Sequence, residues 1–144
     1  MYRTKLRFTV LPLATALMLC ALGACGSERM KEGTVLDKTL YEFSSDIRWS
    51  DFEAAYAFVD PASKTEHPMT DIDRERYKQI EVSTYQVLSK EQGPGTVDQQ
   101  IRLELINRNT QIPRSMTYHE HWRYDELAKH WLLTTGLPDI TAGQ

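Results

Sequence analysis

The chain has 144 residues, of which 26% are charged and 41% are hydrophobic, and its formal net charge is -3. These values are ordinary for a globular protein and allow a single domain. An acidic chain without a run of basic residues is a poor nucleic-acid binder, so no nucleic-acid partner is expected.

Residues 1–24 have the layout of a secretory signal peptide. Arg3, Lys5 and Arg7 supply positive charge without any acid, and residues 8–22 are almost purely apolar. The small residues Gly23 and Ala24 follow. We therefore expect residues 1–24 to be cleaved off.

Cys25 is the predicted site of lipid attachment. The sequence Leu22-Gly23-Ala24-Cys25 resembles the bacterial lipobox, in which the Cys receives a lipid such as palmitate and the chain is cleaved before it. Cys20 is a poor competitor, because Leu19 before it is bulky. The alternatives are an uncleaved transmembrane helix and an ordinary signal peptide with an incidental Cys25.

The lipobox also predicts a location. Gly26, rather than Asp, follows the Cys, and by resemblance to enteric lipoproteins this implies sorting to the outer membrane, facing the periplasm. Cleavage removes three basic residues and no acid, which leaves 120 residues with a net charge of -6. Such a domain has no electrostatic attraction to anionic lipid, so the lipid anchor must hold it. Because Cys20 is lost, no internal disulfide is expected.

The mature chain is predicted to begin with helices. Residues 26–33 are polar, so we expect 25–35 to form the lipidated Cys with a flexible tether and 36–144 to form the folded domain. Leu36, Leu40, Phe43 and Ile47 recur at helical spacing, which predicts an amphipathic helix.

A second helix is predicted to start at Ser50. Ser50 and Glu53 match the S-x-x-E capping box, and Trp49 occupies the position of a hydrophobic staple. Asp60-Pro61 is predicted to end this helix. Residues 62–73 are predicted to form a loop.

Four strands are predicted in the second half, at 78–88, 97–105, 115–124 and 130–134. The first has apolar residues on both faces, so we expect it to be covered on both sides. A hairpin loop at 125–128 would pair Trp122 with Trp131 and Arg123 with His130.

This order predicts an α+β fold, with N-terminal helices packed on a curved antiparallel sheet. The hairpin Trp122-Arg123-Tyr124 with His130-Trp131-Leu132-Leu133 resembles the NTF2-like (cystatin-like cone) superfamily. Segments 47–52, 59–61 and 136–138 resemble small uncharacterised proteobacterial lipoproteins. The resemblance implies a cone-shaped sheet. It implies no activity, because that superfamily contains isomerases, dehydratases and binding modules.

A pocket around Glu120 is the first candidate site. The chain has no strong catalytic motif, so no catalytic residue and no cofactor are assigned. Glu120 shares a strand face with Tyr118, and Tyr85 or Glu104 would line the same pocket. A carboxylate among aromatic rings has a raised pKa, which suits a general base. In the alternative interpretation, Glu120 lies near a sheet edge and pairs with an arginine.

A second candidate is a metal site. His119, His121 and His130 would share one face of the sheet, where three imidazoles could hold zinc or copper. In the alternative they are polar residues on a solvated face, and Arg123 among them would repel a cation.

The sequence therefore predicts a membrane-anchored envelope lipoprotein whose domain is a non-enzymatic binding module for an envelope protein or an apolar ligand. A pocket enzyme of the isomerase or hydratase type and a His-mediated metal binder are the alternatives. A binding module should expose an apolar patch on the sheet or near Pro138.

Overall fold

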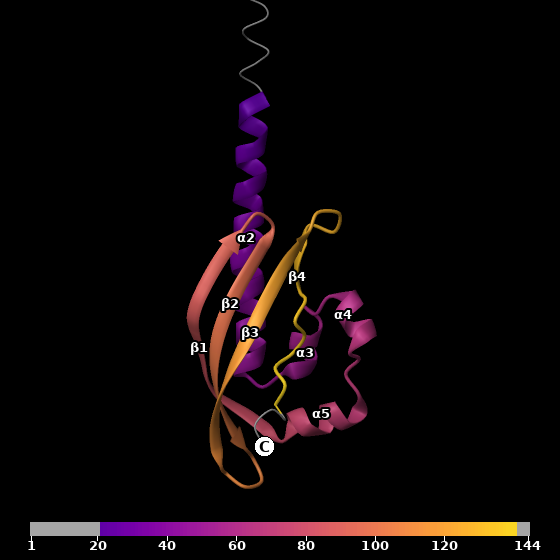
Figure 1. The fold of residues 1–144 in the computed structure, drawn as a ribbon, viewed down its shortest axis with the longest axis vertical. Coiled ribbons are helices and arrows are strands. Elements are labelled where there is room, and N and C mark those ends of the chain that lie inside the picture. The colour runs from indigo at the N-terminus through magenta and orange to yellow at the C-terminus, as the bar shows by residue number, and fades with distance from the viewer. Residues whose placement is uncertain (1–20, 141–144) are drawn as a thin grey trace, which may run out of the picture. The chain divides into compact units, whose positions relative to one another are not determined.

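The computed structural model describes residues 21–140, so most of the predicted signal peptide lies outside the described residues. The chain divides into two compact units, Met1–Thr34 and Val35–Gln144, and the second holds the sheet. The helices are α2 (Ala21–Arg48), α3 (Phe52–Tyr56), α4 (Pro61–Glu66) and α5 (Asp71–Lys78). The strands are β1 (Ile80–Gly93), β2 (Thr96–Asn107), β3 (Pro113–Asp125) and β4 (His130–Leu133) (Figure 1).

The four strands form one open antiparallel sheet in the order β1-β2-β3-β4. The predicted α+β class, with helices before an antiparallel meander, is confirmed. A two-residue turn joins β1 to β2, and Gly95 in it has a φ of 66°, a conformation that favours glycine. Figure 1 shows the segment after β4 running back beside α4 and α5.

The core forms between α2 and the sheet. Leu36, Phe43 and Ile47 are at most 1% exposed, which confirms the predicted helix face. The ring of Phe43 meets the ring of Trp122 on β3 edge to face, with centroids 5.1 Å apart. The helix itself extends from residue 21, so it includes the residues predicted to form the tether.

The predicted start of the second helix is wrong. Asp51, not Ser50, caps α3, and its side chain accepts a hydrogen bond from the Ala54 amide at 3.0 Å. Ser50 has a φ of 59°, and its hydroxyl instead accepts a hydrogen bond from the Val82 amide at 2.9 Å. Trp49 is 82% exposed and forms no staple.

Residues 62–73 are not a loop, because α4 and the start of α5 lie there. Asp60 caps α4, whose first residue is Pro61, a position where proline needs no hydrogen-bond partner. Thr70 and Asp73 form a reciprocal capping box at α5. These capping residues are visible in the sequence, but the many polar residues around them favoured the prediction of a loop.

Strand β1 is not covered on both sides as predicted. It is an edge strand, and Val87 and Leu88 are 49% and 39% exposed. Its register with β2 shifts twice, between Val82 and Thr84 and between Val87 and Ser89. Such irregularities twist an edge strand and discourage pairing with another chain.

The predicted register of the last hairpin is also wrong. Trp131 lies opposite Tyr124, with ring centroids 5.3 Å apart, and His130 lies opposite Asp125. The Asp125 carboxylate accepts hydrogen bonds from the backbone amides of Leu127 and Ala128, each at 2.9 Å. Lys129 at the end of the loop has a φ of 56°. Because the Asp125 side chain closes the turn in this way, the loop consists of residues 126–129 and not of residues 125–128.

Replacing Phe43 by Ala should lower the free energy of unfolding by about 3–5 kcal/mol, because it leaves a cavity against Trp122. The matched control is Tyr41→Ala on the same helix, where the side chain is 70% exposed and the change should be within about 0.5 kcal/mol. Urea unfolding of both variants measures the difference. Equal losses would contradict this placement of the core.

Candidate functional site

The carboxylate of Glu120 is enclosed within the sheet. Glu120 is 1% exposed and lies on the inward face of β3, together with Tyr118 and Trp122. The Tyr85 hydroxyl on β1 donates to Oε1 at 2.7 Å, and the indole Nε1 of Trp122 donates to Oε2 at 3.0 Å. Each carboxylate oxygen therefore has a hydrogen-bond donor.

Burial raises the pKa of Glu120 to about 7, and the hydrogen bonds from Tyr85 and Trp122 oppose part of that rise. Burial likewise raises the pKa of the Tyr85 hydroxyl, with a further contribution from the neighbouring carboxylate. The pKa of Tyr118 is raised for the same two reasons. The tyrosines are thus kept as neutral donors at physiological pH.

The three residues predicted to form a pocket lie close together but do not all meet. Tyr85 contacts Glu120, whereas the Tyr118 hydroxyl donates to the Gly136 carbonyl at 2.6 Å. Glu104 is elsewhere on β2, opposite Ser115. Within residues 21–140, the side-chain hydrogen bonds of Glu120 come from Tyr85 and Trp122 and none comes from an arginine.

A groove of about 290 Å³ lies between α2 and the strands β1 and β2. Tyr85 and Gln99 line it, together with Ser44 and Arg48 of α2. Glu120 does not, so Tyr85 is the residue that both bonds to the buried carboxylate and reaches the groove. A molecule in the groove could therefore contact Tyr85 but not Glu120 directly.

A second groove, of about 390 Å³, lies between the helices α3 to α5 and the segment after β4. Its walls are aromatic and apolar at Tyr56, Met69 and Tyr77, and polar at Asp73 and Asp139. The Tyr77 hydroxyl donates to the Pro138 carbonyl at 3.1 Å, which fixes the C-terminal segment against α5. Pro138 itself is buried.

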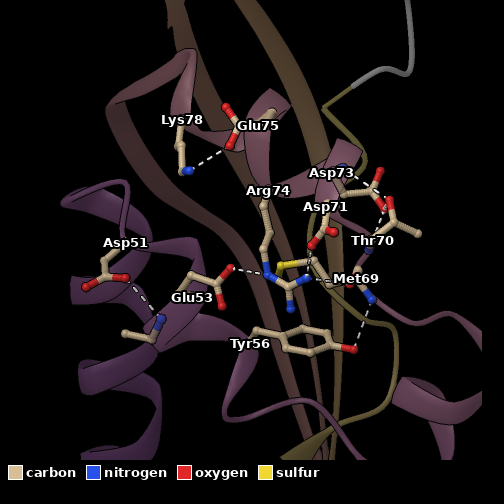
Figure 2. A network of polar contacts seen from close by, with 11 residues as sticks. Asp51, Glu53, Tyr56, Met69, Thr70, Asp71, Asp73, Arg74, Glu75 and Lys78 are labelled. Carbon is tan, nitrogen blue, oxygen red and sulfur yellow. Dashed lines mark hydrogen bonds and ion pairs between the residues drawn. The ribbon is translucent and has the colours of Figure 1, made fainter.

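One arginine holds the helices that form the wall of this second groove (Figure 2). Arg74 of α5 donates through Nε to Glu53 of α3 at 2.7 Å, and through Nη1 to the Met69 carbonyl at 3.1 Å and to Asp71 at 3.2 Å. The Met69 amide in turn donates to the Tyr56 hydroxyl at 3.2 Å. Glu53 thus forms an ion pair with Arg74 of α5 and does not form the predicted capping box with Ser50.

The three histidines of the predicted metal site have separate partners. His121 Nδ1 lies 2.6 Å from a carboxylate oxygen of Asp98, and His130 Nδ1 lies 3.2 Å from the Ala128 carbonyl. His119 is exposed on β3. Between residues 21 and 140 no three His, Cys, Asp or Glu side chains are grouped closely enough to hold a metal ion.

Among the described helices, none combines the length and the apolar character needed to cross a membrane. Cys25 belongs to α2. The predicted lipid attachment at Cys25 remains a prediction from the sequence.

The chain matches no protein-family model and no curated protein sequence. Its fold is similar to the solution structure of a SEC-C motif containing protein from Rhodopseudomonas palustris, with a TM-score of 0.52 and 13% identity. That likeness covers 65% of this chain and 70% of the other. At this identity it concerns the fold alone.

The predicted resemblance to the NTF2-like superfamily is therefore wrong. A structural neighbour is a SEC-C motif containing protein, and the sheet is open, with β1 at one exposed edge. The motif around Trp122 and Trp131 misled the prediction because both residues are at most 2% exposed and fill the core. Many helix-on-sheet folds place aromatic residues there.

Gln99 and Arg48 were missed by the sequence analysis. Gln99 is 6% exposed and occupies an inward position in the alternating strand β2, between Val97 and Ile101. The available signal in the sequence was that Gln99 is a polar residue at a position where the alternation of β2 predicts an apolar one. Arg48 carried no such signal, since a basic residue ending a helix is common.

Arg74→Met should speed amide hydrogen exchange at Met69 and Thr70, because it removes the contacts to Glu53, the Met69 carbonyl and Asp71. The expected stability loss is about 1 kcal/mol, since Arg74 is 37% exposed and its ion pairs are screened. Arg76→Met is the control, because among residues 21–140 the ion pair of Arg76 is with Asp73 on its own helix, at 3.7 Å. Similar exchange rates in both variants would contradict this role.

Glu120 should make the protein less stable as the pH rises from about 4.5 to about 7. Below this range the carboxyl group is neutral in both states. Within it the unfolded chain releases the proton while the folded protein keeps it. The free energy of unfolding should therefore fall by about 3 kcal/mol and then become constant with respect to this group.

Glu120→Gln should remove this component, so the difference between the two curves of unfolding free energy against pH isolates it. Glu91→Gln, at an exposed position of β1, is the control and should keep the wild-type curve. Urea titrations at closely spaced pH values provide the measurement. A variant with the wild-type pH dependence would refute the burial of an ionisable Glu120.

Proposed function

We propose that this protein is an envelope lipoprotein whose domain binds a partner or ligand while a lipid on Cys25 holds it at the membrane. The observation that carries the proposal is the sequence Leu22-Gly23-Ala24-Cys25 directly after the apolar stretch 8–22. Gly26 after the Cys supports an outer-membrane location facing the periplasm. The partner would be an envelope protein or a small ligand.

The arrangement around Glu120 supports binding rather than catalysis. A general base must come within hydrogen-bond reach of the substrate. Glu120 is 1% exposed, both of its oxygens accept hydrogen bonds, and it lines neither of the two grooves. Its position is that of an interior polar group that orders the sheet.

The two grooves support the binding role. Each is open and combines apolar walls with a few polar side chains, which is typical of sites for small ligands or peptide segments. Glu120, the carboxylate predicted to act as a general base, lines neither groove. An enzyme would therefore have to use other titratable groups, such as His67 and Asp73 in the larger groove or Tyr85 in the smaller one.

Cys25→Ser should abolish incorporation of labelled palmitate, because a hydroxyl at this position cannot take the place of the thiol that receives the lipid. The variant should then be either released or left with its signal peptide attached, which gel mobility distinguishes. Cys20→Ser is the matched control, since it changes the other cysteine of the chain and should leave labelling and membrane fractionation unchanged. Undiminished labelling of Cys25→Ser would refute the anchor.

A further inference from the structure

Gln99 is buried beside the groove between α2 and the strands, without a hydrogen-bond partner. It is 6% exposed and lines the groove, and its carboxamide forms no hydrogen bond with any residue between 21 and 140. The neighbouring carboxylate of Glu120 accepts its hydrogen bonds from Tyr85 and Trp122, not from Gln99. The carboxamide is not among the fully enclosed polar atoms of residues 21–140, so it reaches the groove, where a ligand could accept or donate the hydrogen bonds that the protein does not supply.

The basic residues of the groove lack acidic partners as well. Arg48 donates to the Ser44 hydroxyl at 3.2 Å and lies 5.9 Å from the centre of the Tyr85 ring, but within residues 21–140 it forms no ion pair. Lys90, which is opposite Gln99 in the β1–β2 register, forms none with the described residues either. Two unpaired cations beside an unpartnered amide favour an anion.

We propose that this groove binds a small monocarboxylate with an apolar body. The Gln99 amide and the Arg48 guanidinium would donate to the carboxylate, and Leu40 and Val87 would contact the body. A dianion such as phosphate fits less well, because Asp37 lines the same groove and Glu120 lies behind Tyr85. This assignment names a ligand class for the proposed binding module and rests on that part of the proposed function.

The test is fluorine NMR of para-fluorophenylacetate, titrated with the purified mature protein, as processed in the cell, in nanodiscs. The probe should bind, and Gln99→Leu should weaken its binding by about tenfold or more, the effect of losing one hydrogen bond to a charged group. The thermal midpoint of Gln99→Leu should be unchanged or higher, because the variant removes no hydrogen bond within residues 21–140 and replaces a mostly buried polar side chain by an apolar one. Gln100→Leu, one residue along β2 on the opposite face, should bind as the wild type does.

The charge of the ligand is tested separately. Arg48→Gln should weaken para-fluorophenylacetate binding by a similar factor, and the neutral para-fluorophenylacetamide should bind about tenfold or more weakly to the wild type. Inorganic phosphate should not displace the acid. Equal binding of acid and amide, displacement by phosphate, or no binding of the acid would each overturn the proposal.

The outcomes separate this proposal from the anchor. Palmitate labelling of the same preparation reports on Cys25 and does not depend on the groove. A labelled protein that fails to bind para-fluorophenylacetate leaves the lipoprotein assignment intact and refutes the carboxylate site. A protein that binds para-fluorophenylacetate but carries no lipid supports the carboxylate site and refutes the lipid anchor.

Discussion

The buried carboxylate of Glu120 constrains the inner face of the sheet, because it joins a residue of β1 to residues of β3. Removing a carboxylate from water is unfavourable unless donors replace the lost hydration. Tyr85 and Trp122 supply these donors at 2.7 and 3.0 Å, from β1 and β3. The Tyr85 bond spans the intervening strand β2, so it fixes the twice-shifted edge strand β1 onto the rest of the sheet. Trp122 is in turn held by Phe43 of α2.

This constraint also determines the character of the neighbouring groove. Lys90, Gln99 and Glu120 are register partners across β1, β2 and β3. The oxygens of Glu120 accept hydrogen bonds from Tyr85 and Trp122, and Gln99 forms none with Glu120. The Gln99 amide therefore lies at the groove without a hydrogen bond from Glu120. It remains available to bind a ligand, whereas Glu120 is held by Tyr85 and Trp122.

The parts of the fold that rest on local periodicity could be predicted from the sequence. The helix face of Leu36, Phe43 and Ile47 and the alternation of β2 were correct, because burial of one face repeats along a single element. Some errors were local, since Asp51 caps α3 and Thr70 forms a capping box with Asp73 at α5. Another arose from a side chain that acts at a distance, because Glu53 pairs with Arg74, 21 residues away. No pattern within one element predicts such pairings.

The charge of the protein limits how the groove can bind an anion. After cleavage the chain would carry a net charge of -6, so the protein as a whole repels negative ligands. Salt screens this repulsion beyond about 8 Å at physiological ionic strength, whereas contacts within the groove are screened far less. Arg48, Lys90 and the Gln99 amide line one small groove. Binding there must therefore depend on contact distances rather than on long-range steering, which favours ligands whose apolar body also packs against the walls of the groove.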